Sequence, residues 1–147
     1  PWIKSKKRKA IMTAKFYFFD CGVTNTLAGI KTIDRQSDLY GKRLEQLIVN
    51  EVRAYNSYFR KHAKLSFWRD KHDFEVDLLI NDDIAIEIKA TARVGERDFR
   101  GLKMLQEEGV FKKFYLVSND NNGRVHKGLT SLHYLEFLKK LWGGLIF

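Results

Sequence analysis

The spacing of hydrophobic residues predicts an amphipathic helix in the first half of the chain. Residues 38–60 carry apolar side chains at three- and four-residue intervals, Leu44, Leu47, Ile48, Val52, Tyr55, Tyr58 and Phe59. These side chains line one face of the helix, which indicates that this face packs against a core, and Asp38 is the expected N-cap. Two further helices are expected over residues 98–108 and 131–142, the second with Ser131 as its cap.

Short apolar or aromatic runs predict five strands around these helices, over residues 15–20, 65–69, 74–80, 84–89 and 114–118. Such a succession of strands and helices predicts an α/β fold in which a central mixed β-sheet is flanked by α-helices. No repeat or linker divides the chain. Residues 15–147 are therefore expected to form one domain, preceded by a basic lead-in of residues 1–14.

The two strands within residues 74–89 alternate apolar and polar residues and predict a hairpin with a three-residue loop. One face of this hairpin then carries six apolar side chains, Val76, Leu78, Ile80, Ile84, Ile86 and Ile88. The other face pairs Asp77 with Glu87, and Glu75 with Lys89. A two-residue loop would change the pairing parity and place an apolar residue opposite Asp77, so the pattern favours the odd-length loop.

The expected pair of Asp77 and Glu87 is costly unless a cation offsets it, because the Cβ atoms of opposed residues lie roughly 4.5–5.5 Å apart. One or two carboxylates with waters and phosphate oxygens are the ligands that Mg²⁺, or Mn²⁺ in its place, prefers. On the same face, Lys89 could orient or help to deprotonate an attacking water and neutralise charge on the phosphorus. The alternation alone equally allows a solvated face with a Glu75–Lys89 ion pair and an exposed Asp77.

The net charge of +9, from 27 Lys and Arg against 18 Asp and Glu, favours a polyanionic partner, nucleic acid rather than a membrane. The basic run of residues 4–9 is either a flexible lead-in or a phosphate-binding arm. No apolar run reaches the ~20 residues of a membrane span. The single Cys21 favours a reducing, cytoplasmic location. Four basic residues after the hairpin are candidates for contacting a nucleic-acid backbone or, alternatively, form a solvated helix face: Arg93, Arg97, Arg100 and Lys103.

The hairpin motif resembles the signature of the PD-(D/E)XK nucleases, which has an Asp on one strand, here in Glu75-Val76-Asp77-Leu78-Leu79-Ile80, and a Glu-x-Lys on the next, here in Ile86-Glu87-Ile88-Lys89. More closely, the chain is similar to the domain of unknown function found C-terminal to an AAA-type ATPase in many archaeal and bacterial proteins. Three stretches carry this resemblance, residues 17–23, 41–45 and 67–89. It spans most of the chain, from about Lys15 to Asp120.

The resemblance implies a restriction-endonuclease-like core and divalent-metal-dependent hydrolysis of phosphodiester bonds, with DNA as the expected substrate. It also implies that Glu45 joins Asp77, Glu87 and Lys89 in the site, although Glu51 lies closer to the apolar stripe of the same helix. The alternative function is an inert nuclease-fold module that docks DNA or a partner to the ATPase.

The ATPase itself is expected outside this sequence, because no Gly-x-x-x-x-Gly-Lys phosphate loop is present. The chain begins at Pro1 rather than Met, which also leads us to expect a fragment of a longer, ATPase-containing protein.

Overall fold

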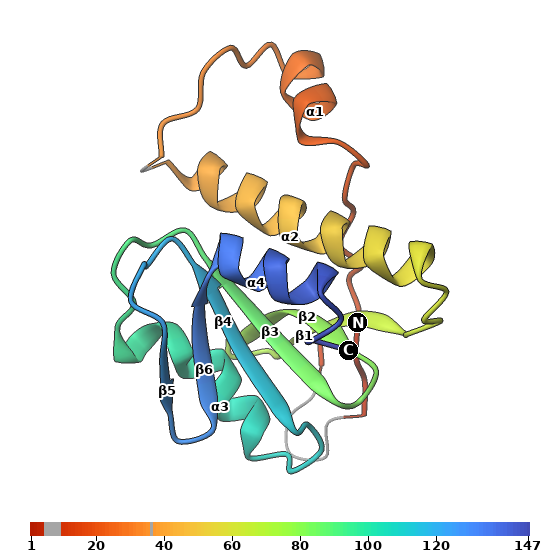
Figure 1. Ribbon diagram of the computed structural model, residues 1–147, viewed down its shortest axis with the longest axis vertical. Helices are drawn as coiled ribbons and strands as arrows, with labels where there is room; N and C mark the ends of the chain where they lie inside the picture. Colours follow the sequence, from red (N-terminus) through yellow and green to blue (C-terminus); the bar gives the residue numbers. More distant parts are fainter. Residues whose placement is uncertain (5–9, 36) are drawn as a thin grey trace.

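A mixed β-sheet of six strands forms the centre of the part of the chain that the computed structural model describes, residues 1–4, 10–35 and 37–147 (Figure 1). The strand order is β1-β2-β3-β4-β6-β5. Neighbours are antiparallel from β1 to β3, parallel from β3 through β4 to β6, and antiparallel between β6 and β5. The bounds are Leu65–Arg69 for β1, Glu75–Ile80 for β2, Ile84–Lys89 for β3, Lys113–Ser118 for β4, Arg124–His126 for β5 and Leu129–His133 for β6.

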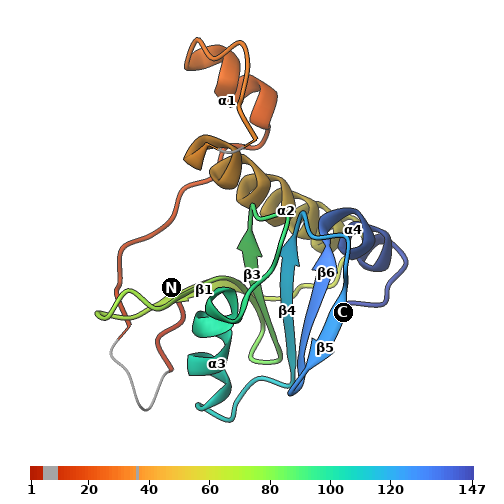
Figure 2. The same cartoon turned by 90° about the vertical axis from the view of Figure 1, so that its left-hand side faces the viewer.

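Helices cover both faces of this sheet (Figure 2). One face carries α2 (Asp38–Tyr58) and α4 (Tyr134–Trp142), and the other carries α3 (Arg100–Gln106), which follows the 3₁₀ turn η1 (Glu96–Phe99). The short helix α1 (Cys21–Leu27) stands beyond α2, away from the sheet, and buries none of its residues (Figure 1). The arrangement confirms the predicted α/β class with a mixed sheet between helices.

Two hydrophobic clusters fill the space on either side of the sheet. The cluster beneath α2 and α4 contains Leu44, Ile86 and Phe137. The cluster beneath α3 contains Leu102 and also Trp2, whose ring centroid lies 5.2 Å from that of Phe111. Part of the expected lead-in therefore packs into the core. The basic run predicted as a flexible lead-in or a phosphate-binding arm falls largely on residues 5–9, which lie outside the described residues.

The β2–β3 hairpin pairs as the hydrophobic pattern predicts. Ile80 lies opposite Ile84 and Leu78 opposite Ile86, so the loop has three residues. The backbone pairing of β2 with β3 ends at Leu78 and Ile86. The cross-strand pairs expected beyond this point, including that of Asp77 with Glu87, are therefore absent from the β2–β3 ladder in the described chain.

Val76 does not share the face of the other five apolar hairpin residues, because β2 contains one extra residue relative to β1. Two steps along β1 separate Ser66 from Trp68, whereas three steps along β2 separate their partners Leu79 and Val76. Such a β-bulge reverses the direction of the side chains beyond it. Val76 accordingly packs in the cluster beneath α3 with Leu79. The extra residue falls next to Asp77, where the two hairpin strands separate.

The expected boundaries of all three helices are wrong by a few residues, and the helix predicted over residues 98–108 is the shorter α3, which follows η1. α2 is capped by Ser37 rather than Asp38, since the Ser37 hydroxyl accepts a hydrogen bond from the Tyr40 N–H at 3.3 Å. The last helix begins three residues later than predicted, because Ser131 belongs to β6 and pairs with β4. β5 and β6 were not predicted. They are joined by Lys127 and Gly128, whose φ angles of 49° and 79° are those of a two-residue hairpin turn.

Residues 15–20 form no strand, contrary to the prediction. This segment runs along α2, where the side-chain amide of Asn50 donates to the Phe19 carbonyl at 3.0 Å in place of a strand partner. The Phe16 and Phe19 side chains point outward and are 82% and 78% exposed. Aromatic residues stabilise a strand by packing against a neighbouring strand. In the described chain no strand forms a ladder with this segment.

The close packing of α3 on β2 predicts opposite effects for two glycine substitutions. A Cβ at Gly101 would overlap the backbone oxygen of Glu75, so Gly101→Ala should lower the free energy of unfolding by about 1–3 kcal/mol. A Cβ at Gly41 in α2 would meet the Ala90 Cβ at an ordinary 3.7 Å, so Gly41→Ala should stabilise by about 0.5–1 kcal/mol. Urea unfolding of both variants tests this. Equal effects would contradict the close approach of α3 to β2.

Candidate active site

Asp77 lies where β2 and β3 separate, and only 8% of it is exposed. Its Oδ2 accepts a hydrogen bond from the backbone N–H of Ile88 at 2.9 Å, in a stretch where β2 and β3 are no longer paired. Burial raises the pKa of Asp77 to about 6, the negative charge of Glu45 contributes to the rise, and the positive charge of Lys15 opposes it. A carboxylate in such surroundings gains from any further cation.

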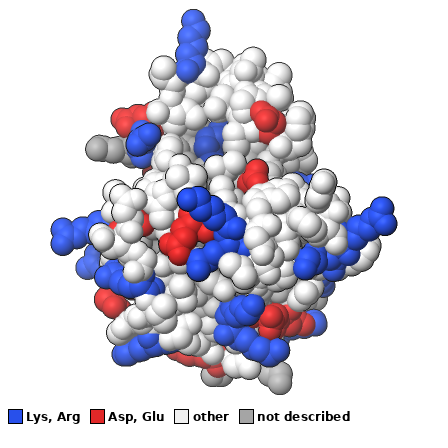
Figure 3. Space-filling model, viewed as in Figure 1, with Lys and Arg blue, Asp and Glu red and all other residues white. Residues whose placement is uncertain are grey.

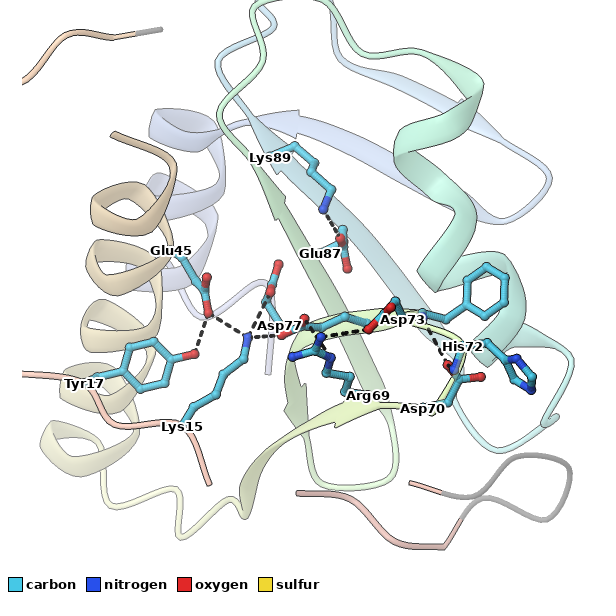
Figure 4. Close-up of polar contacts among 12 residues, drawn as sticks. Lys15, Tyr17, Glu45, Arg69, Asp70, His72, Asp73, Asp77, Glu87 and Lys89 are labelled. Atoms are coloured by element: carbon cyan, nitrogen blue, oxygen red, sulfur yellow. Dashed lines mark hydrogen bonds and ion pairs between the residues drawn. The ribbon is translucent and has the colours of Figure 1, made fainter. Parts of the chain in front are cut away.

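The ammonium group of Lys15 bridges carboxylates from α2 and β2 (Figure 4). Its Nζ lies 2.9 Å from Oε1 of Glu45, 3.2 Å from Oδ1 of Asp77, and in contact with Oε1 of Glu75. The Tyr17 hydroxyl donates to the same Glu45 oxygen at 2.6 Å. Burial lowers the pKa of Lys15, but the charges of Asp77 and Glu45 more than offset this and raise it above its usual value, so Lys15 is a permanent cation here.

Glu87 and Lys89 form a second group on β3, with Lys89 Nζ 2.6 Å from Glu87 Oε1. Glu87 is 3% exposed, and its other oxygen, Oε2, has no hydrogen-bond partner among the described residues. Burial raises the pKa of Glu87 well above its ordinary value, the charge of Asp77 adds to this, and Lys89 offsets only part of it. An orphaned carboxylate oxygen of this kind takes either a proton or a metal ion.

The solvated-face alternative for the hairpin is wrong. Glu75 pairs with Lys15 and lies 3.9 Å from the Arg69 guanidinium, while Lys89 pairs with Glu87. Asp77 and Glu87 are both buried rather than exposed. These acids therefore occupy positions where an uncompensated charge is expensive.

The structure also separates the two candidate acids of α2. Glu45 lies in the Lys15 group and faces Asp77 through the shared ammonium (Figure 4). Glu51 lies two turns further along and accepts a hydrogen bond from the Trp142 indole at 2.8 Å. Glu45 is thus the helix acid that the fold brings to the hairpin.

Two hollows meet at Glu75 and Lys89, which line both of them. The acid hollow, about 480 Å³, is also lined by Glu45 and Asp77. The α3 hollow, about 360 Å³, is also lined by the buried acid of β3 and by basic residues of η1 and α3: Glu87, Arg97 and Arg100. The acids thus line two hollows that share Glu75 and Lys89.

Of the four basic residues singled out in the sequence, two reach this surface. Arg97 and Arg100 line the α3 hollow, and the Arg100 guanidinium lies 5.4 Å from the Phe74 ring centroid. Lys103 is neutralised by Glu96 at 2.5 Å, and Arg93 is exposed and lines neither hollow. Elsewhere, Figure 3 shows Lys and Arg interspersed with acids rather than gathered into one patch. Arg97 and Arg100 are the two of these four basic residues that line a hollow beside the acids.

Three residues of the site escaped sequence reasoning: Lys15, Tyr17 and Glu75. Lys15 and Tyr17 alternate with the exposed Phe16 and Phe18, in a segment where the predicted strand does not form. Their partner Glu45 is about 30 residues away, however, and no local pattern reveals such a contact. Glu75 was assigned a lysine partner on β3 because the bulge in β2 leaves no signal in the sequence.

The acidic side chains fit a metal site with two protein carboxylates better than one in which the protein supplies every ligand. No group of three or more His, Cys, Asp or Glu in the described part of the chain is arranged to hold a metal ion. Two acids with waters and substrate phosphate are nevertheless the usual surroundings of Mg²⁺. The orphaned Oε2 of Glu87 and the buried Asp77 are consistent with that smaller set.

Fold and site together define an α/β domain with a buried carboxylate–lysine cluster where β2 begins and β3 ends. Residues 40–136 match the model of a family described as a domain of unknown function, DUF4143, and the protein belongs to this family. The matched region contains Glu45, Asp77, Glu87 and Lys89, and it begins after Lys15. No curated protein and no solved structure gave a match. Among the described helices, none combines the length and the apolar character needed to cross a membrane.

The raised pKa of Asp77 predicts how stability depends on pH when no divalent metal is present. Between its ordinary value of 3.8 and about 6, the folded protein keeps a proton that the unfolded chain has released. The contribution of the Asp77 carboxyl to the free energy of unfolding is therefore fully present below pH 3.8 and is lost as the pH rises through about 6. Relative to wild type, Asp77→Asn should gain up to about 3 kcal/mol between pH 4 and pH 7, since one pKa unit is worth about 1.4 kcal/mol.

Denaturant unfolding at several pH values, in the presence of a chelator, measures this difference. Asp82 in the loop of the same hairpin is a matched control, because its hydrogen bond from Lys4 lowers its pKa. Asp82→Asn should therefore lose stability relative to wild type only as the pH rises through the region near and below 3.8, and its difference from wild type should be nearly constant from about pH 5 to pH 7. Parallel profiles for wild type and Asp77→Asn would show that Asp77 is not destabilised by burial.

Proposed function

We propose that this protein is a divalent-metal-dependent nuclease domain that hydrolyses phosphodiester bonds in nucleic acid, with DNA as the expected substrate. The observation that carries the proposal is the pair of buried acids, Asp77 and Glu87, on neighbouring strands beside Lys89. Burying two interacting carboxylates in an apolar sheet costs stability, and a metal site is a physical reason to retain them. The resemblance of these residues to the PD-(D/E)XK signature, and with it a restriction-endonuclease-like core, supports the same proposal.

In this proposal Asp77 and Glu87 would hold Mg²⁺ or Mn²⁺, which would polarise a phosphate oxygen and lower the pKa of a bound water. The Lys89 side chain is 42% exposed and lines both hollows, and its ammonium, paired with Glu87, would approach a phosphate oxygen or orient the water. Glu45, held by the Tyr17 hydroxyl, would accept hydrogen bonds from waters in the acid hollow. Beside them, Arg97 and Arg100 would contact the nucleic-acid backbone.

The partner in this proposal is an AAA-type ATPase domain fused outside the sequence described. Support for it comes from the resemblance alone. The nuclease chemistry proposed for Asp77, Glu87 and Lys89 needs no residue of that domain.

One observation favours a second candidate function, that of an inert module with a nuclease-like fold that docks DNA or a partner to the ATPase. Lys15 already places a positive charge among Glu45, Glu75 and Asp77. A cluster neutralised by its own lysine could persist without binding metal. Titration calorimetry with Mn²⁺ separates the candidates, since the inert module would take up no metal at Asp77 and Glu87.

The nuclease proposal predicts that three conservative substitutions each abolish cleavage. Asp77→Asn, Glu87→Gln and Lys89→Met should reduce Mn²⁺-dependent cleavage of single-stranded and duplex DNA by at least about a hundredfold. Glu51→Gln in α2 and Lys139→Met in α4 remove charges elsewhere and should leave the rate unchanged. Gel assays measure the rates, and thermal melts establish that each variant is folded. Full activity in both Asp77→Asn and Lys89→Met would eliminate the proposed mechanism.

The position of Lys15 leads to a second prediction, because a metal ion at Asp77 must compete with the Lys15 ammonium. Lys15→Met should melt at a lower temperature in chelator, because Glu45, Glu75 and Asp77 lose their shared cation. It should also bind Mn²⁺ about tenfold more tightly than wild type and gain more thermal stability from it. Lys61→Met, a change to a lysine over the Tyr55 ring, is the control. Equal Mn²⁺ affinity in wild type and Lys15→Met would mean that the two cations do not compete.

A further inference from the structure

The three parallel strands of the sheet end level with one another beside the acid hollow. The backbone register aligns Lys89 of β3 with Ser118 of β4, and Ser118 with His133 of β6. Figure 2 shows their arrowheads pointing the same way, toward α2. In open α/β sheets, ligands bind in the crevice outside the carboxyl ends of such strands.

A hollow of about 590 Å³ occupies this crevice. Its floor is formed by residues that follow the strands, and its opposite wall by the start of α2 and the residues before it. Hollows of a few hundred Å³ lined by rings and a few polar groups are typical of small-molecule sites. We call this space the carboxyl-end hollow; it is lined by Arg35, Tyr40, Ala90, Thr91, Ala92, Asn119, Asn121, His133 and Tyr134.

The lining combines aromatic rings with amide groups. The rings of His133 and Tyr134 lie 4.6 Å apart, and Tyr40 faces the hollow from α2. The Tyr40 hydroxyl lies 3.4 Å from Oδ1 of Asn119, so the two walls touch, while the Asn119 side-chain nitrogen has no partner among the described residues. Stacking surfaces beside hydrogen-bonding edges are what an unpaired nucleobase requires. A purely apolar ligand would leave the side-chain amides without hydrogen-bond partners. A phosphate would contact a single cationic side chain, that of Arg35.

The carboxyl-end hollow is continuous with the proposed site of phosphodiester chemistry. It shares Arg35 and Ala90 with the acid hollow, and Ala90 directly follows Lys89. A strand whose phosphate lies at Asp77 can therefore place the adjoining nucleoside in the carboxyl-end hollow. A base reaches such a pocket only when it is unpaired and out of the helical stack.

We propose that the carboxyl-end hollow binds an unpaired nucleobase of the substrate, so that the domain acts on single-stranded DNA or on DNA with an unpaired segment. The inference rests on the proposed nuclease function and names its substrate class. Tyr40 supplies a stacking face, and Asn119 and Asn121 supply hydrogen bonds to the base edge. These residues set binding and position rather than the hydrolysis itself.

Binding in chelator tests this without any cleavage step. The probes are a single-stranded oligonucleotide carrying 2-aminopurine and the fully paired duplex of the same sequence. Wild type should bind the single strand more tightly and quench the 2-aminopurine fluorescence. Tyr40→Ala should weaken that binding by roughly tenfold, the effect of losing one stacked base, and leave duplex binding unchanged.

Tyr58→Ala is the matched control, because Tyr58 lies at the other end of α2 and is 77% exposed. Asn121→Ala is a second variant in case Tyr40→Ala fails to fold, because Asn121 is exposed. It should weaken single-strand binding and leave the melting temperature unchanged. Equal affinity for single strand and duplex would overturn the inference. Unchanged binding in both Asn121→Ala and a folded Tyr40→Ala would overturn it as well.

Cleavage assays with Mn²⁺ then separate the two proposals. Duplex cleaved as fast as single strand would refute the unpaired-base site while leaving the nuclease function in place. Single-strand binding that depends on Tyr40, with no cleavage in Mn²⁺, would refute the nuclease function and leave the hollow as the DNA-docking surface of an inert module.

Discussion

The cost of burying negative charge where β2 and β3 separate governs the arrangement of the whole site. Asp77 and Glu87 are both less than a tenth exposed, and the charge of Asp77 adds to the burial that raises the pKa of Glu87. A carboxylate moved out of water must be paired or protonated, or must bind a metal. Two of these solutions are visible here: pairing, by a backbone N–H and a lysine at Asp77 and a second lysine at Glu87, and protonation, since both pKa values are shifted toward the protonated form.

The β-bulge in β2 makes this arrangement possible. A regular hairpin would continue its ladder past Leu78 and engage the Ile88 N–H with a backbone carbonyl. The extra residue ends the ladder, and the Asp77 side chain accepts that hydrogen bond instead. It also turns Val76 toward α3, while Glu75 reaches the Lys15 ammonium. One inserted residue thus exchanges a stretch of regular sheet for a polar cluster, which agrees with the frequent occurrence of bulges beside functional sites.

Sequence reasoning succeeded where the signal is local and failed where it is not. The hairpin loop follows from alternation over a few residues, and the strand from Leu65 to Arg69 follows from a short aromatic run; the structure has both as predicted. The segment over residues 15–20 looked like a strand because its composition is aromatic, yet its partner is a helix about 30 residues away. Likewise, the pattern identified Asp77, Glu87 and Lys89 but not the Lys15 ammonium. No residue near Lys15 in the sequence indicates that three carboxylates contact it.

The mixed topology of the sheet explains why one strand can serve both proposed parts of the site. β3 is antiparallel to β2, so its end lies beside the start of β2, where Glu75 and Asp77 are. It is also parallel to β4, so the same end lies level with the ends of β4 and β6. An all-antiparallel sheet would provide the acids without the crevice, and an all-parallel sheet the crevice without the hairpin. Ala90, which directly follows Lys89 at the end of β3, therefore lines both the acid hollow and the carboxyl-end hollow.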